Sequence, residues 1–90
     1  MINIMIKNDA FKKLKKLSEK EEKKISDALR KIQENKLSGI KKIPSSDLFA
    51  KKISNHVLIM TKKENDFYII DIMTKSKFDL EYKKSIRLLF

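Results

Sequence analysis

The sequence predicts an α+β fold with an N-terminal strand, a helical hairpin, an antiparallel sheet and a short C-terminal helix. Three observations predict this order. Apolar residues recur at helical spacing before Gly39, at a spacing of about two after it, and at helical spacing again near the end. The 90 residues, 41% of them hydrophobic, suit a single domain over residues 1–90 with one modest core.

The first third of the chain predicts a strand and a helix. Residues 2–6 are apolar apart from Asn3, which suits a short buried strand. Asn8 or Asp9 is then expected to cap a helix, because short polar side chains satisfy the first free amides. The apolar face of this helix would consist of Ala10, Phe11, Leu14 and Leu17.

A second helix is predicted directly after the first. Ser18 and Glu21 have the spacing of a capping box, in which the hydroxyl and the carboxylate satisfy backbone amides at a helix start. The apolar face of the helix follows an i, i+3, i+4, i+7 pattern, and Gly39 comes shortly after its expected end. The residues of that face are Ile25, Ala28, Leu29 and Ile32.

The segment after Gly39 predicts an antiparallel meander. Ser54-Asn55 suits a two-residue turn, and residues 63–66 suit a looser one, with a loop expected over 44–47. The predicted strands lie around Ile40 and Ile43 and over 48–53, 56–61 and 67–73.

The C-terminal segment predicts a basic loop and a helix. Residues 74–77, Thr-Lys-Ser-Lys, are expected to be a loop that brings two cations and two hydroxyls beside the sheet. The apolar stripe of the following helix would consist of Phe78, Tyr82, Ile86 and Leu89.

Charge and composition restrict the partners. Lys and Arg number 22 against 12 Asp and Glu, a net charge of +10, which favours a polyanion: nucleic acid, an anionic membrane surface or an acidic protein. Charge alone does not rank these three partners, and a surface that is basic only for solubility is a further alternative. With no cysteine and one histidine, no metal site or other cofactor is expected. No segment reaches the length of a membrane span or signal sequence, so we expect a cytoplasmic protein without a membrane partner.

The predicted hairpin assigns the central cations to faces. A two-residue turn at Ser54-Asn55 places Lys52 opposite Val57, and alternation puts Lys51 on the other face of the sheet. His56 falls on the face opposite to Lys52. One face must hold the helical hairpin, so the other is expected to be left for a ligand.

Each candidate also has an ordinary interpretation. Lys52 has the character of a strand-edge lysine, and His56, beside a turn, that of a surface or packing histidine. Tyr82 lies on the apolar stripe of the last helix, where packing is the default. The residues alone therefore do not demonstrate a catalytic site.

The order of elements resembles the RelE/ParE superfamily of toxins from type II toxin-antitoxin modules, over nearly the whole chain. Residues 1–32 resemble the opening strand and Lys-rich hairpin, and 48–53 the segment with a basic residue before the turn. Residues 56–60 resemble the segment after the turn, and 70–77 with 82–89 the last strand, basic loop and tyrosine-bearing tail.

The resemblance implies a ribosome-dependent mRNA endonuclease, in which a 2′-hydroxyl attacks the adjacent phosphate. By position, Lys52 would stabilise the phosphate, Lys75 would supply a second cation with Lys77 nearby, and Tyr82 would stack on or activate the nucleotide. Lys51, Lys77 and His56 are secondary candidates for phosphate binding, with His56 also a possible acid or base.

Three positions depart from the RelE pattern. Val57 replaces an arginine, and Ala50 and Leu48 fall where lysines can occur. Since one preorganised donor is worth roughly 3–4 kcal/mol of barrier, the chain is a slow RNase, a differently arranged one, or none. The alternatives are a ParE-type toxin acting on DNA gyrase and a non-toxic basic nucleic-acid-binding module.

The resemblance also implies partners. These are the ribosome with its mRNA and a cognate antitoxin, whose acidic segment would fold on this cationic surface. The flanks of the helical hairpin and residues 86–90 are the expected docking site.

Overall fold

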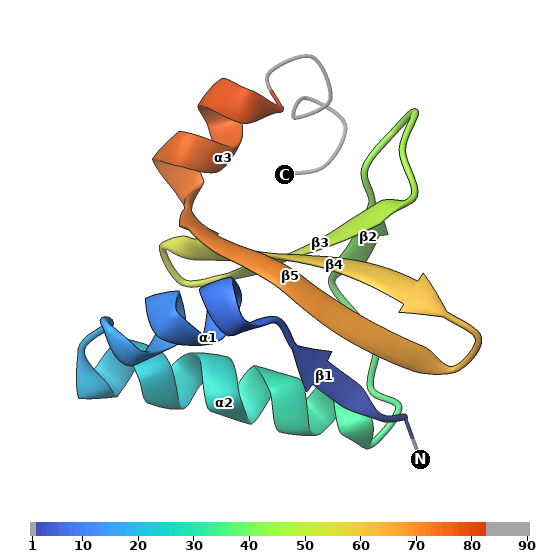
Figure 1. The fold of residues 1–90 in the computed structure, drawn as a ribbon, viewed down its shortest axis with the longest axis horizontal. Coiled ribbons are helices and arrows are strands. Elements are labelled where there is room, and N and C mark those ends of the chain that lie inside the picture. The colour runs from blue at the N-terminus through green and yellow to red at the C-terminus, as the bar shows by residue number, and fades with distance from the viewer. Residues whose placement is uncertain (1, 83–90) are drawn as a thin grey trace.

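The computed structural model describes residues 2–82, which form an α+β fold (Figure 1). The predicted order of strand, helical hairpin, antiparallel strands and C-terminal helix is confirmed. The elements are β1 (Ile4–Ile6), α1 (Asn8–Lys15), α2 (Glu19–Gln33), β2 (Ile40–Lys42), β3 (Leu48–Ile53), β4 (His56–Lys63), β5 (Asp66–Thr74) and α3 (Lys75–Glu81).

The sheet has the strand order β1-β5-β4-β3-β2. β1 runs parallel to β5, and the other neighbours are antiparallel. The predicted hairpin register is confirmed, because Lys52 faces Val57 and Ile53 faces His56 across the turn. A β-bulge leaves Ile70 without a partner, since Ile59 pairs with Asp71 while Met60 pairs with Ile69.

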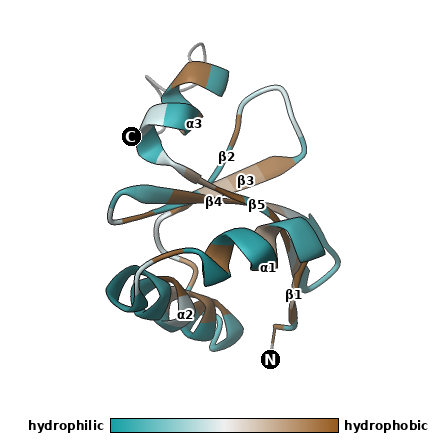
Figure 2. Ribbon diagram, turned by 60° about the vertical axis from the view of Figure 1, so that its left-hand side comes forward, coloured by the Kyte–Doolittle hydropathy of each residue, from teal (hydrophilic) through white to brown (hydrophobic). Residues whose placement is uncertain are grey.

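Helices cover both faces of the sheet, with α1 and α2 on one side and α3 on the other (Figures 1 and 2). Apolar side chains accordingly form two clusters, where the sequence predicted one core. The hairpin-side cluster includes Leu14, Ile25, Ile32, Leu58, Met60 and Phe67. The α3-side cluster consists of Ile43, Ala50, Val57, Ile59, Met73 and Phe78, with Leu48, Ile70 and Tyr82 packed against it.

The start of α1 differs from the prediction. Lys7 is the N-cap and makes no side-chain cap hydrogen bond, while Asn8 and Asp9 lie inside the helix. The Lys7 amide donates to the Ile69 carbonyl at 2.9 Å, which continues the pairing of β1 with β5. The chain therefore stays extended through Lys7, and the helix begins one residue later.

The predicted capping box at α2 is half formed. The Ser18 hydroxyl accepts from the Glu21 amide at 3.2 Å, as expected. The Glu21 carboxylate instead accepts from the Ser18 hydroxyl at 3.3 Å and contacts His56 of β4. At its other end, α2 is followed by Asn35 in the left-handed region (φ 64°), so Gly39 (φ 83°) serves the later turn into β2.

The prediction of a loop over residues 74–77 is wrong, because these residues start α3. Thr74 is the N-cap, and its hydroxyl accepts from the Lys77 amide at 3.2 Å. The Lys75 amide donates to the Asn55 carbonyl at 2.9 Å, so the β3–β4 turn binds the start of the helix. Of the predicted C-terminal stripe, Phe78 lies in α3 and Tyr82 caps it; Ile86 and Leu89 lie outside the described residues.

Phe78 joins α3 to the sheet. It is fully buried, whereas Leu80 of the same helix is 81% exposed. We expect Phe78→Ala to lower the free energy of unfolding by about 3–5 kcal/mol through the cavity it leaves, and Leu80→Ala to change it by less than about 0.5 kcal/mol. Urea denaturation followed by circular dichroism measures both. Equal effects of the two changes would show that α3 is not held by Phe78.

Candidate functional site

The sequence predicted that the face of the sheet opposite the helical hairpin would be left open for a ligand. This prediction is wrong, because that face is covered. α3 lies over it (Figure 1), and Phe78 of this helix is buried in the α3-side cluster together with Val57 of β4 and Met73 of β5. The centre of this face is therefore apolar and buried. Polar side chains of the candidate site lie around its rim.

Lys52 occupies the rim on β3. It shares a face with Ala50, two residues earlier, and with its cross-strand partner Val57, both buried in the α3-side cluster. The Lys52 side chain is exposed and makes no ion pair with any residue in 2–82. Its positive charge is thus available to an anion bound at this edge.

Lys75 and Lys77 begin α3 at the same end of the sheet. The hydrogen bond from the Lys75 amide to Asn55 places this helix start three residues from Lys52 along the turn. However, the Lys75 ammonium contacts Asp79, and Lys77 Nζ lies 3.9 Å from Glu81 Oε1, each one helical turn away. Both cations are partly neutralised, so Lys52 carries more free charge than either.

Tyr82 lies at the far end of α3. Tyr82 is seven positions after Lys75, about 10 Å along the helix axis. Its ring packs against Phe78 with centroids 4.9 Å apart and an interplanar angle of 31°. Burial, followed by the charges of Glu81 and Asp71, raises the pKa of the Tyr82 hydroxyl above its usual 10.0. The Tyr82 hydroxyl is therefore neutral at physiological pH and can donate a hydrogen bond.

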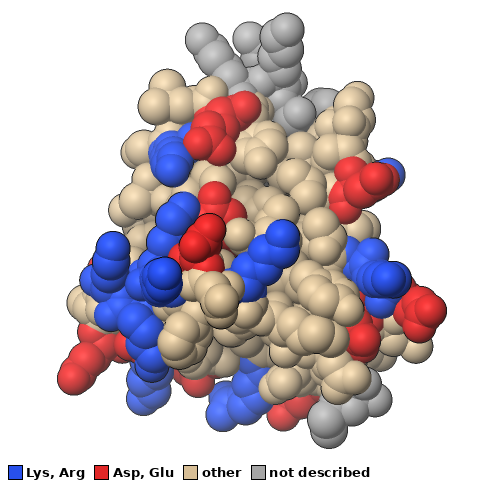
Figure 3. Space-filling model, viewed as in Figure 1, with Lys and Arg blue, Asp and Glu red and all other residues tan. Residues whose placement is uncertain are grey.

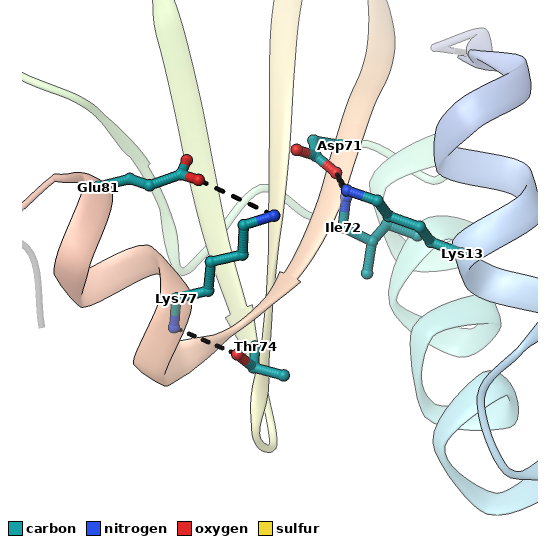
Figure 4. A network of polar contacts seen from close by, with 6 residues as sticks. All are labelled: Lys13, Asp71, Ile72, Thr74, Lys77 and Glu81. Atoms are coloured by element: carbon teal, nitrogen blue, oxygen red, sulfur yellow. Dashed lines mark hydrogen bonds and ion pairs between the residues drawn. The ribbon is translucent and has the colours of Figure 1, made fainter.

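Asp71 is a polar residue of this region that the sequence did not single out. Its Oδ1 accepts from Lys13 Nζ of α1 at 2.5 Å and from the Ile72 amide at 2.8 Å (Figure 4). The bulge at Ile70 sets which residue of β5 lies opposite Ile59. No pattern in the sequence marks that bulge, so the position of Asp71 could not be foreseen.

Lys51 and His56 lie on the hairpin side, as alternation predicted. Lys51 Nζ donates to the Ser38 carbonyl at 2.9 Å. His56 is 8% exposed, and its Nδ1 lies 3.0 Å from Glu21 Oε2. Of the predicted catalytic residues, Tyr82 packs against the α3-side cluster at one end of α3, whereas Lys52 and Lys75 lie near the β3–β4 turn at the other end. His56 lies on the opposite face of the sheet. The phosphate-binding roles of Lys51, Lys77 and His56 stay predictions.

Val57, which stands where the RelE pattern has an arginine, is fully buried under α3. A guanidinium at this position would need a buried counter-charge, which the α3-side cluster does not contain. Arg30 does not replace it, since it lies on α2 and contacts Asp27 at 3.6 Å. Arg87 lies outside the described residues.

The charge of the molecule is spread over its surface. Figure 3 shows basic side chains gathered at the lower left, over the α1–α2 hairpin, with acidic side chains between many of them. Within residues 2–82, no three His, Asp or Glu side chains are placed to hold a metal ion. No helix in that part of the chain is long and apolar enough to cross a membrane.

Comparison with known proteins gives matches among solved structures. No protein-family model matches the chain, and no curated protein matches it significantly. The YoeB-YefM complex from Staphylococcus aureus matches with 26% identity and a TM-score of 0.65, over 81% of this chain and 95% of that chain. The YoeB dimer from Staphylococcus aureus matches with 27% identity and a TM-score of 0.62, over 80% and 94% of the two chains.

The raised pKa of Tyr82 gives a direct prediction. Absorbance titration should show its tyrosinate forming above the usual pH, and Tyr82→Phe should remove that titration. Asp71→Asn should lower the pKa toward 10.0, while Asp66→Asn, at the other end of β5, should not. The pKa of Tyr82 is higher in the folded state than in the unfolded state. The free energy of unfolding therefore keeps its full value below the unfolded-state pKa and falls as pH rises through the folded-state pKa. An unchanged Tyr82 pKa in Asp71→Asn would contradict the contribution of Asp71.

Proposed function

We propose that this chain, which has the RelE-like fold of RelE/ParE superfamily toxins, is a type II toxin that cuts messenger RNA on the ribosome. The fold match to YoeB over about four fifths of the chain carries the proposal. The resemblance in the order of elements and the net charge of +10 support it.

The residues around the α3-side cluster suit a cleavage in which a 2′-hydroxyl attacks the adjacent phosphate. Lys52 supplies an unpaired ammonium that stabilises the charge growing on the phosphorus oxygens. Lys75, close to the β3–β4 turn, supplies a second cation once a phosphate competes with Asp79 for it. Without an arginine at position 57, phosphate binding depends on point charges rather than on a bidentate fork.

Tyr82 is assigned the role of a donor. A hydroxyl with a raised pKa stays protonated, so it can donate a hydrogen bond to a phosphate oxygen or a proton to the leaving 5′-oxygen. It is a poor general base for the same reason. The base that accepts the 2′-hydroxyl proton is therefore a different group, on the RNA, on the ribosome or on another part of this chain.

The mechanism predicts specific losses of activity. In a reconstituted translation reaction, Lys52→Ala should lower the rate of mRNA cleavage by about 10²- to 10³-fold, the effect of one lost electrostatic donor. Tyr82→Phe should lower it while leaving ribosome binding unchanged. Lys63→Ala, which removes an exposed cation at the far end of β4, is the matched control. Full cleavage by a Lys52→Ala, Tyr82→Phe double variant would remove both residues from the mechanism.

A second function, inhibition of DNA gyrase by a ParE-type toxin, is favoured by one observation. Val57 is buried in the α3-side cluster, so position 57 lacks the arginine that the RNases of the superfamily have there. A supercoiling assay beside the translation assay separates the two activities. Inhibition of supercoiling with no cleavage of mRNA would select the gyrase target.

We assign the chain a protein partner as well, an acidic antitoxin. The solved complex that it resembles contains YefM with YoeB. Co-expression with the product of an adjacent reading frame should end growth arrest, and the two proteins should purify together. Persistent arrest, with no complex on size-exclusion chromatography, would contradict this partner.

A further inference from the structure

A groove with four lysines lies between α2 and the edge of β3. Lys24 and Lys31 border it from the helix, and Lys51 and Lys52 border it from the strand. Its volume is 340 Å³, and it is shallow rather than enclosed. We call it the α2–β3 groove.

The groove exists because β2 covers only part of β3. β2 pairs with residues Phe49 to Lys51, so Lys52 and Ile53 lie beyond the end of that pairing. Lys52 points to the α3 side and Lys51 to the hairpin side, yet both border the groove because it follows the edge of the sheet. Lys52 therefore belongs both to this groove and to the candidate site.

The charge in the groove is largely uncompensated. Lys24, Lys31 and Lys52 form no ion pairs within the described part of the chain. The acid that borders the groove, Asp27, is already 3.6 Å from Arg30 on its own helix. A ligand here meets three free ammonium groups against one partly neutralised carboxylate.

The arrangement suits a repeating phosphate chain better than an acidic peptide. Lys24 and Lys31 are seven residues apart on one face of α2, roughly 10 Å along its axis, and Lys52 continues the row onto the sheet. The apolar floor consists only of Ala28 and Ile53, with no deep pocket to hold the anchor side chain of a protein partner. None of the lining residues is aromatic, so binding would use the backbone rather than stack the bases.

We infer that the α2–β3 groove binds the phosphate backbone of single-stranded RNA and guides it around the edge of β3 to Lys52. This inference rests on the proposed function for its substrate. It adds Lys24 and Lys31 to the RNA-binding surface, although both lie on the hairpin side, remote from the residues around Tyr82.

The test measures binding of a fluorescein-labelled, 2′-O-methyl oligouridine by anisotropy over a range of salt concentrations. The 2′-O-methyl groups prevent cleavage. Removing two phosphate contacts from a single strand should lower the salt slope of log K by about 1.4 and weaken binding roughly 10- to 30-fold at about 0.1 M salt. Lys24→Ala with Lys31→Ala is expected to show both effects.

Two variants complete the design. Lys23→Ala with Lys63→Ala removes the same charge from exposed sites outside the groove and should leave the salt slope near that of wild type. Lys24→Arg with Lys31→Arg keeps the charge and should retain binding. Circular dichroism confirms that each variant is folded.

The inference is overturned if the groove and control variants lose oligouridine binding equally. It is also overturned if the groove variant weakens binding only of polyglutamate, which would identify an acidic protein segment as the ligand. The outcome is independent of the proposed activity. A wild-type protein without mRNA cleavage, but with groove-dependent binding, would refute the toxin mechanism alone. Cleavage dependent on Lys52, with an unaltered salt slope in the groove variant, would refute the groove alone.

Discussion

The burial of strand β4 on both of its faces is the constraint on which the rest of the molecule depends. Four consecutive residues from Val57 to Met60 are at most 1% exposed. Leu58 and Met60 pack against the helical hairpin, while Val57 and Ile59 pack under α3. A strand that is covered on both faces has a continuous run of apolar residues in its sequence. Such a strand requires a layer of helices on each side of the sheet.

This constraint keeps charge out of the centre and places it at the rim. An arginine at position 57 would point into a cluster of Ile, Val, Ala, Met and Phe side chains, where an unpaired charge is costly. Lys52, only two residues from buried Ala50, escapes because β3 reaches the edge of the sheet there. Position 57 is thus in the apolar centre of the sheet, whereas Lys52 lies at its open edge.

The lysines of this molecule differ in how far acidic side chains neutralise them. Lys75 and Lys77 are paired with acids one turn along α3, and Lys13 is paired with Asp71. Lys24, Lys31 and Lys52 have no such partner among residues 2–82, and these three border a single groove. The net charge of +10 thus overstates the number of sites for a polyanion. Which lysines are free depends on ion pairs made between and within helices, and the charge total does not record these.

The sequence by itself determined the order of elements, the β3–β4 register and the opposite faces of Lys51 and Lys52. These follow from local periodicity and from a two-residue turn, which need no distant partner. The tertiary structure alone decided the start of α1 at Asn8, the contact of Glu21 with His56, and the covered second face. Each depends on residues far apart in the chain: Lys7 with Ile69, Glu21 with His56, and Phe78 with Val57. A local pattern has no means of recording such contacts, because their free energy appears only when the strands and helices have packed together.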